Sequence, residues 1–239
     1  MPNKPCVPEG RRVYAIGDVH GRADLLKLML DQINEDAAKT TADEFVLIFL
    51  GDYVDRGPES DKVLGLVSDG LPGFAKVALM GNHERLMLDA LHGDDPSACE
   101  QWLLNGGSET LSSYGIEPST DITTFSELHR CLPPSHRQLL ESLRLSHVEG
   151  DYLFAHAGIN PARNWDDQIE DDLIWIRDEF LNSTADFGKI VVHGHTIGRA
   201  VIERSNRIGL DTAAYRSGIL SGIVLEGVKR RIINAVQQE

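Results

Sequence analysis

Three apolar, strand-like runs near the start of this chain each end in a glycine that is followed at once by a polar residue. Glycine permits positive φ angles and close backbone approach, so each junction predicts a sharp turn at a strand end. Apolar residues at helical spacing lie between the runs, and this alternation predicts βαβ units and a largely parallel sheet. The three junctions are Gly17-Asp18, Gly51-Asp52 and Gly81-Asn82.

The same patterns predict how the whole chain is organised. Strands are expected at residues 13–16, 45–50, 77–80, 152–155 and 190–192, and residues 201–236 are expected to be β-rich. Helices are expected over residues 25–37, from Pro58 to Gly70, and over 86–91. We expect one α/β domain over residues 1–239, with two packed sheets and helices outside. Residues 1–11 should form a loose tail, and residues 93–150 a helical, cap-like insertion that covers the site.

Composition excludes some classes of function. The net charge is −14 and no Lys/Arg-rich block is present, which disfavours a nucleic-acid partner. No stretch approaches the ~18 apolar residues of a membrane span, and the first residues lack the apolar core of a signal peptide. Three widely spaced cysteines favour a reducing compartment. We therefore expect a cytoplasmic protein that binds neither membrane nor nucleic acid, and the sequence does not indicate its oligomeric state.

Residue types that bind metals follow five of the expected strands. Because sites in α/β folds lie beyond the carboxyl ends of strands, these side chains should meet at one edge. Singly, such an Asp is more often a turn former or a helix N-cap, and such a His a satisfied core or surface residue. Five strand ends together favour a metal site, and oxygen and nitrogen donors without cysteine indicate Mn, Fe or Zn. The candidates are Asp18, Asp52, Asn82, His156 and His195, with His20 two residues after Asp18.

The remaining histidines are assigned less directly. His193 and His195 lie on the same face of an expected strand, so either could reach a metal. We expect His195 to be the ligand and His193 to be structural. The four histidines outside any ligand pattern are expected at the surface: His92, His129, His136 and His147.

Five short motifs resemble the signature of the phosphoprotein phosphatase (PPP) family, which are calcineurin-like metallophosphoesterases that include bacterial and phage serine/threonine phosphatases. The motifs are GDVHG at 17–21, GDYVDRG at 51–57, GNHE at 81–84, FAHA at 154–157 and GHT at 194–196. The resemblance runs from about residue 12 to 226 and is weak over 93–150. It implies a β-sandwich of two mixed sheets flanked by helices.

The resemblance also implies a role for each matched residue. Asp52 would bridge two divalent ions, Mn²⁺ being expected and Fe or Zn the alternatives. His83 would be the general acid and Asp55 would orient it, while Arg56, Arg177 and Asn82 would contact the substrate phosphate. Asp18, His20 and Asp52 would hold the first ion, and Asp52, Asn82, His156 and His195 the second.

Charge arithmetic supports phosphate chemistry at such a site. Two divalent ions bring +4 and two aspartates remove two, which leaves +2 before the arginines are counted. We expect a metal-bridging hydroxide to attack phosphorus in line, in phosphoserine or phosphothreonine of a protein or peptide, with phosphotyrosine as a further substrate. A diadenosine tetraphosphate hydrolase is the alternative, although that branch typically reads GNHD where this chain has Glu84. A metal-binding regulatory protein that has lost catalysis is disfavoured because none of the matched positions is broken.

Overall fold

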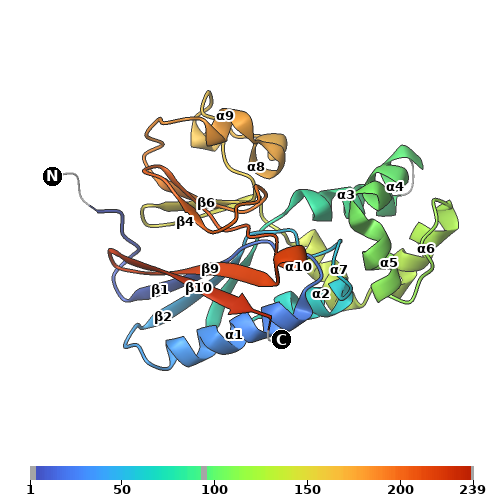
Figure 1. Cartoon of the computed structure of the whole chain (residues 1–239), viewed down its shortest axis with the longest axis horizontal. Helices are drawn as coiled ribbons and strands as arrows, with labels where there is room; N and C mark the ends of the chain where they lie inside the picture. Colours follow the sequence, from blue (N-terminus) through green and yellow to red (C-terminus); the bar gives the residue numbers. More distant parts are fainter. Residues whose placement is uncertain (1–3, 93–95, 238–239) are drawn as a thin grey trace.

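Two five-stranded mixed sheets pack face to face with helices on their outer sides in the computed structural model, which describes residues 4–92 and 96–237 (Figure 1). This architecture confirms the expected α/β sandwich. In the first sheet the strand order is β10-β9-β1-β2-β3, and β1, β2 and β3 are parallel. Its strands are β1 (Arg11–Ile16), β2 (Glu44–Phe49), β3 (Phe74–Ala78), β9 (Ile219–Glu226) and β10 (Lys229–Val236).

The second sheet has the order β4-β5-β6-β8-β7, in which β5, β6 and β8 are parallel. Because the parallel strands of each sheet end on the same side of the sandwich, their carboxyl ends bring distant parts of the chain together. The strands are β4 (Ser146–Glu149), β5 (Tyr152–Ala155), β6 (Ile190–His193), β7 (Ile202–Glu203) and β8 (Arg207–Gly209).

The continuous apolar runs arise because the central strands are buried on both faces. In β1, Val13 and Ala15 pack into the core between the sheets. Tyr14 and Ile16 point the other way, into the core beneath the helices. The first strands therefore sit rigidly in the molecule, and the turns that follow them are fixed from two sides.

Helices cover both outer faces and also form a lobe at one end. α1 (Ala23–Ala37) and α2 (Ser60–Asp69) lie under the first sheet, and α8 (Glu170–Trp175) and α9 (Asp178–Leu181) lie over the second (Figure 1). The helical lobe extends from α3 and shares the first sheet's outer core. It comprises α3 (Asn82–His92), α4 (Pro96–Trp102), the π-helical turn η1 (Leu103–Gly107), α5 (Ser108–Ser113), α6 (Ile122–Cys131) and α7 (Pro134–Glu141).

Short elements complete the fold: η2 (Trp165–Asp167) before α8, and α10 (Ala214–Ser217) before β9. Among the described residues, none of the helices has both the length and the apolar character that crossing a bilayer requires. The part of the expected tail that is described is packed, not loose. Val7 is buried and its N–H donates to Gly227 O, and Asp151 N–H donates to Cys6 O.

Several element boundaries differ from expectation. The third strand is Phe74–Ala78 and not 77–80, and the third helix begins at Asn82 and not at residue 86. The second helix begins at Ser60, not at Pro58, because the preceding residues pack against the turn after β1, where Glu59 N–H donates to Gly21 O at 3.0 Å. Its predicted end is confirmed, since Gly70 caps it with φ of 63°. In the segment 93–150, which is described from residue 96, the last helix ends at residue 141. The last residues of the segment form β4, which pairs antiparallel with β5 around Gly150, where φ is 57°.

The surface prediction for His136 is wrong. This side chain is buried, and its Nδ1 lies 2.7 Å from the Tyr114 hydroxyl. Gly65 of α2 lies beside the ring, since a Cβ at that position would be in ordinary van der Waals contact with His136 Nε2 at 3.6 Å. His92 and His129 are exposed as expected, and His147 is half-buried beside Glu149.

Candidate active site

Strained backbone is concentrated at the carboxyl ends of the strands. Positive φ is uncommon for residues other than glycine and persists where the surroundings enforce it, at a cost of about 1 kcal/mol or more. Among the described residues other than glycine, five of the six in this region are predicted site residues. The six are His20 (φ 44°), Asp52 (53°), Asp55 (71°), Arg56 (68°), His195 (60°) and Ala213 (55°).

The junction glycines serve two different purposes. Only Gly51 has a positive φ, of 103°. Gly17 and Gly81 are required by close approach, since a Cβ at Gly81 would lie 2.2 Å from Asp52 Oδ1 and one at Gly17 would lie 2.7 Å from Leu210 O. The sharp turns were thus predicted correctly, but the ligand residue, not the glycine, often adopts the left-handed conformation.

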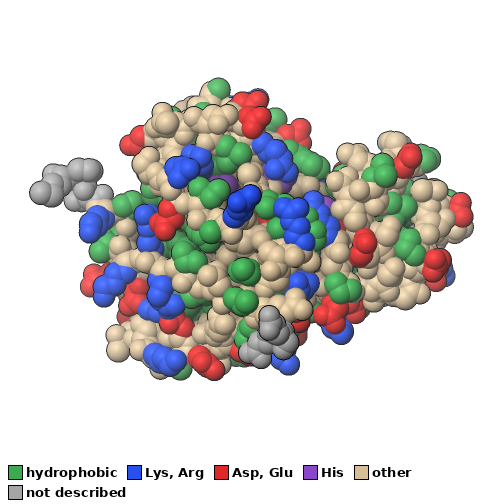
Figure 2. Space-filling view, in the orientation of Figure 1, with side chains coloured by type: hydrophobic (Ala, Val, Ile, Leu, Met, Phe, Trp, Pro, Cys, Tyr) green, Lys and Arg blue, Asp and Glu red, His purple; other side chains and the backbone are tan. Residues whose placement is uncertain are grey.

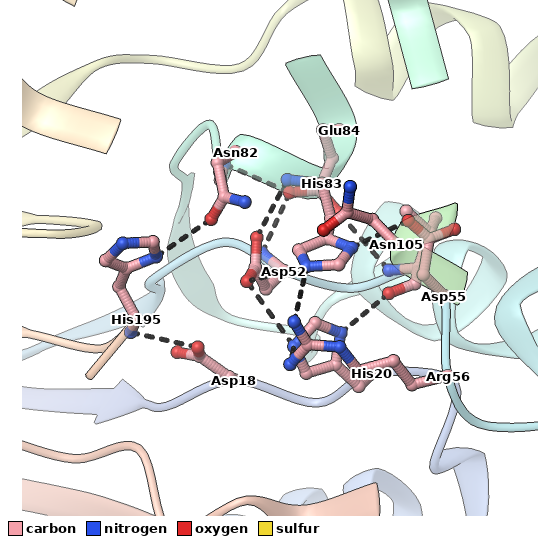
Figure 3. A network of polar contacts seen from close by, with 12 residues as sticks. Asp18, His20, Asp52, Asp55, Arg56, Asn82, His83, Glu84, Asn105 and His195 are labelled. Atoms are coloured by element: carbon pink, nitrogen blue, oxygen red, sulfur yellow. Dashed lines mark hydrogen bonds and ion pairs between the residues drawn. The ribbon is translucent and has the colours of Figure 1, made fainter. Parts of the chain in front are cut away.

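One group of donors converges on Asn82, and we call it the Asn82 half-site: Asp52, Asn82, His156 and His195. Asn82 Oδ1 lies 2.9 Å from His195 Nδ1 (Figure 3). The same oxygen lies 3.0 Å from His156 Nε2. Asp52 Oδ1 lies 3.4 Å from His156 Nε2. His156 Nδ1 donates to Leu50 O at 2.9 Å, so the lone pair of Nε2 points at the other donors. This arrangement suits a cation that takes nitrogen and oxygen ligands.

A second group lies on the other side of Asp52, and we call it the His20 half-site: Asp18, His20 and Asp52. His20 Nδ1 donates to Val54 O at 2.8 Å, and His20 Nε2 lies 3.4 Å from Asp52 Oδ2. The two Asp52 oxygens therefore face different half-sites, as a bridging carboxylate requires. Ligand atoms of His20, Asp52 and His83 lie within 4.8 Å of one another, as do those of Asp52, His156 and His195.

Asp18 supplies a carboxylate whose charge lacks compensation. Its Oδ2 accepts a hydrogen bond from His195 N–H at 2.9 Å, whereas its buried Oδ1 has no partner among the described residues. Burial and the neighbouring carboxylates Asp211 and Asp52 raise the pKa of Asp18 well above its ordinary value. A divalent cation would relieve this repulsion, so the donor set at both half-sites fits a dinuclear centre.

The guanidinium of Arg56 lies within the His20 half-site. Its Nη1 donates to His20 Nε2 at 2.9 Å, and its Nη2 donates to His83 Nε2 at 2.9 Å (Figure 3). A metal ion held by His20 would need the same Nε2 lone pair. Arg56 must therefore move away from His20 when a metal binds there, and its charge would then be available to the substrate phosphate.

The histidines of the two half-sites are held in the neutral form that binds metals. Burial lowers the pKa of His20 to about 3 and that of His195 to about 2. Burial alone would raise the pKa of Asp52, but the surrounding histidines, His156 first among them, hold it below its ordinary value. At neutral pH the site thus presents an ionised Asp52 and neutral imidazoles, which is the state that metal ligation needs.

His83 and Asp55 form a buried pair beside the His20 half-site. His83 Nδ1 lies 2.7 Å from Asp55 Oδ2, and His83 Nε2 faces Asp52 Oδ2 at 4.0 Å. Burial disfavours the charged imidazole, but Asp52 and Asp55 outweigh it and raise the pKa of His83 above its ordinary value. In this geometry Nε2 accepts from Arg56, so His83 can carry a proton on Nε2 toward the space next to Asp52 only after Arg56 has moved.

Arginine side chains surround the opening of the site. Arg177 is exposed, and its Nη1 donates to His195 O at 3.4 Å. Figure 2 shows Lys and Arg side chains around the partly visible histidines in the middle of this face. Although the chain carries a net charge of −14, this surface is locally cationic and suits an anionic ligand.

His193 lies outside both half-sites. It ends β6, and its ring packs edge-on against Phe180 with centroids 5.1 Å apart, while its Nδ1 donates to the backbone oxygen of Gly194 at 3.0 Å. The left-handed turn at His195 breaks the strand periodicity, so the two histidines do not share a direction. This geometry supports the structural role expected for His193.

Sequence reasoning missed several residues that shape the site. Glu84 accepts hydrogen bonds from Asp52 N–H at 2.8 Å and Gly81 N–H at 3.0 Å and thereby ties two ligand turns together. Tyr215 packs against His20, with centroids 5.5 Å apart, and no sequence pattern indicates it. Asp211 follows β8 closely and could have been found by the rule that located the other strand-end residues. Trp102 and Thr110 were also missed, and both donate to Asp55.

The comparisons with known proteins agree with this geometry. The family model for calcineurin-like phosphoesterases matches residues 11–216. The chain is 29% identical to serine/threonine-protein phosphatase 2 of Salmonella typhimurium, over 88% of this chain and 91% of that protein. It is 33% identical to the symmetrical bis(5'-nucleosyl)-tetraphosphatase of Delftia acidovorans, over 65% of this chain but 47% of that protein.

Solved structures show the same fold. A crystal structure of a "putative diadenosine tetraphosphatase" superposes with a TM-score of 0.64 at 22% identity and covers 99% of this chain and 100% of that one. The family match, the fold and the two groups of His and Asp donors together imply a dinuclear divalent metal centre and phosphoester hydrolysis. The chain belongs to the calcineurin-like phosphoesterase family.

Proposed function

We propose that this phosphoesterase hydrolyses phosphoserine and phosphothreonine in proteins, with phosphotyrosine as a further substrate and Mn²⁺ as the metal. The observation that carries the proposal is the buried Asp55–His83 pair, with its 2.7 Å hydrogen bond and its Nε2 directed at the metal-ligand carboxylate Asp52. A serine or threonine alkoxide is a poor leaving group that needs a proton as it departs. A nucleotide that leaves through its phosphate departs as a stable anion, so it needs a proton far less.

Each residue of the chain then has a defined task. Divalent ions held in the two half-sites would supply the activated water and would neutralise phosphate charge. Arg56 and Arg177 bind and orient the phosphate, and Asn82 keeps its half-site cationic because it is a neutral ligand. Once Arg56 has turned from His83 to the phosphate, His83 takes a proton on Nε2 and gives it to the ester oxygen as the P–O bond breaks, and Asp55 holds its ring in position. The Nε2 of His83 is reprotonated from solvent before the next turnover.

The similar proteins include protein phosphatases and dinucleoside polyphosphate hydrolases, and their coverage differs. The match to a serine/threonine-protein phosphatase spans 91% of that relative, which supports a protein substrate. A dinucleoside polyphosphate remains the second candidate because the match to a bis(5'-nucleosyl)-tetraphosphatase reaches 33% identity, although it spans 47% of that relative.

A rate comparison separates the two candidates. We expect kcat/KM for a phosphoserine or phosphothreonine peptide to exceed that for diadenosine tetraphosphate with the Mn²⁺-loaded full chain. A preference of about 100-fold or more for the dinucleotide, equivalent to about 2.7 kcal/mol of transition-state binding, would overturn the proposal. If the Mn²⁺-loaded chain did not hydrolyse p-nitrophenyl phosphate, both candidate activities would be wrong. A metal-binding regulatory protein without catalysis would then be the better interpretation.

A further inference from the structure

The helical lobe contacts Asp55 through two fully buried side chains. Trp102, the last residue of α4, donates its indole Nε1–H to both carboxylate oxygens of Asp55, at 3.0 Å each. Thr110 of α5 donates its hydroxyl to Asp55 Oδ1 at 2.7 Å. Neither contact belongs to the metal half-sites, and neither residue lies in a motif that carries the family resemblance.

The same segment also holds the backbone of Asp55 and Arg56. Asp55 N–H donates to Thr110 Oγ1 at 2.9 Å, and Arg56 N–H donates to Gly106 O at 3.2 Å. Gly106 has a φ of 103°, and a Cβ there would lie 2.9 Å from Arg56 N. Because Asp55 and Arg56 both have positive φ, the surroundings must enforce their conformation, and the π-helical turn between Trp102 and Thr110 does so.

The hydrogen bonds to the Asp55 carboxylate fix its orientation toward His83. A buried carboxylate that accepts from Trp102, Thr110 and His83 has its orientation fixed by three donors from separate elements. Without the first two donors, Asp55 could rotate and the 2.7 Å contact between its Oδ2 and His83 Nδ1 would loosen. The position of His83 would then no longer match the departing oxygen.

We propose that Trp102 and Thr110 are positioning residues for the general acid: they clamp Asp55, and through Asp55 they align His83. The inference rests on the acid role given to His83 under the proposed function. It assigns the segment 93–150 a part in the chemical step, in addition to any part in substrate choice.

The test uses the leaving group as its readout. Nitrophenolate is a stable anion, so hydrolysis of p-nitrophenyl phosphate depends little on the acid, whereas hydrolysis of a phosphoserine peptide depends on it strongly. A variant that merely folds less well lowers both rates by the same factor. The ratio of the two kcat values therefore reports on the acid and is insensitive to the active fraction.

The informative variants are Trp102→Phe, which removes the donor but keeps an aromatic ring, and Thr110→Val, which removes the hydroxyl. We expect each to lower the ratio of kcat on phosphoserine peptide to kcat on p-nitrophenyl phosphate by about 10-fold or more, part of the 10²–10⁴-fold that an acid contributes. Thr110→Ser should restore the ratio. Phe125→Leu is the matched packing control, because Phe125 is buried against the Trp102 ring at a centroid distance of 6.1 Å but does not touch Asp55.

A second readout does not require activity. In the metal-free chain, the proton shared between His83 Nδ1 and Asp55 should give a low-field NMR signal that is absent from His83→Asn. We expect this signal to be lost or displaced in Trp102→Phe and Thr110→Val and retained in Phe125→Leu. An unchanged ratio of the two kcat values in both Trp102→Phe and Thr110→Val would overturn the proposal, whatever the NMR signal shows.

The acid role itself is tested separately. If His83→Asn does not lower the ratio, the acid assignment fails, and the clamp fails with it. If His83→Asn lowers the ratio but Trp102→Phe and Thr110→Val do not, the acid role stands and only the positioning role of Trp102 and Thr110 is wrong. The choice between protein and dinucleotide substrates is decided by the kcat/KM comparison and does not enter this test.

Discussion

The two half-sites share Asp52 but differ in how far the metal-free chain prepares them. In the Asn82 half-site, donor atoms from Asn82, His156 and His195 already converge at about 3 Å, without an intervening side chain. In the His20 half-site, the Arg56 guanidinium takes the lone pair of His20 Nε2 at 2.9 Å. The difference indicates that the Asn82 half-site is formed by the fold, whereas the His20 half-site is completed only when Arg56 moves.

The physical cause of this difference is where the ligands come from. The Asn82 half-site takes ligands from both sheets, and the two sheets are locked together by the core between them. The His20 half-site lies next to the loop that carries Asp55 and Arg56, both with left-handed backbone. We therefore expect Mn²⁺ to bind more tightly at the Asn82 half-site.

The largest effect should come from the residue that both half-sites share. Asp52→Asn removes the negative charge that faces His20 with one oxygen and His156 with the other. We expect turnover to fall by about 10⁴-fold or more, because both metal functions depend on it. Metal analysis should find fewer than two tightly bound ions per chain, and retention of two ions with normal affinity would contradict the bridging role.

His83→Asn should have the next largest effect. We expect turnover on a phosphoserine peptide to fall by about 10²–10⁴-fold while the metal content stays that of the wild type. His83 lies close enough to His20 and Asp52 to be a metal ligand in its own right. A loss of bound Mn²⁺ in this variant would show that His83 is a ligand and not the acid.

Arg56→Ala should have opposite effects on metal affinity and on turnover. Removing the guanidinium frees His20 Nε2, so the weaker Mn²⁺ should bind several-fold more tightly while the tighter Mn²⁺ is unchanged. Turnover should fall by about 10–100-fold because a phosphate contact is lost. Arg177→Ala is the control, because it should lower turnover without changing either metal affinity, as measured by calorimetric titration. Weaker binding of both ions in Arg56→Ala would contradict competition at His20.

The smallest effect is on the pH dependence of the free energy of unfolding. It concerns His193, which lies outside both half-sites. Burial lowers the pKa of His193 to about 4, whereas an unfolded histidine titrates near 6.5. Between these pH values the unfolded chain binds more protons, so the free energy of unfolding must fall as the pH is lowered. Urea unfolding of the metal-free chain should show a loss between pH 7 and 5, to which His193 contributes about 1–2 kcal/mol.

Replacement of His193 provides the check on that prediction. His193→Gln should reduce the pH dependence of unfolding, whereas His129→Gln at an exposed position should not. A wild-type pH dependence in His193→Gln would mean that the buried ring is protonated in the folded state.

The sequence predicted most of the strands, and it predicted which polar residues meet at the strand ends, because both follow one physical rule. Runs such as residues 45–50 are apolar on both faces, as buried parallel strands are, and the turn residue after each strand is visible in the sequence. The candidate residues Asp18, Asp52, Asn82 and His156 were located by this rule alone. It could also have located Asp211, which follows β8 and whose pKa is raised by burial to about 6.

What the sequence did not predict depends on contacts between distant segments. The hydrogen bonds from Trp102 and Thr110 to Asp55 span 47 and 55 residues, and no local periodicity encodes them. The buried position of His136 includes a contact with the Tyr114 hydroxyl, 22 residues away in the sequence. The position of Arg56 between His20 and His83 arises from a left-handed pair of non-glycine residues, which residue preferences would not suggest.

A crystal structure of the Mn²⁺-loaded chain, with anomalous data collected at the Mn edge, tests the account most directly. We predict two anomalous peaks about 3.5–4 Å apart on either side of Asp52, with Arg56 displaced from His20 Nε2. A single peak, or two peaks with Arg56 still bonded to His20, would contradict the assignment of Asp52 as the bridge between two half-sites.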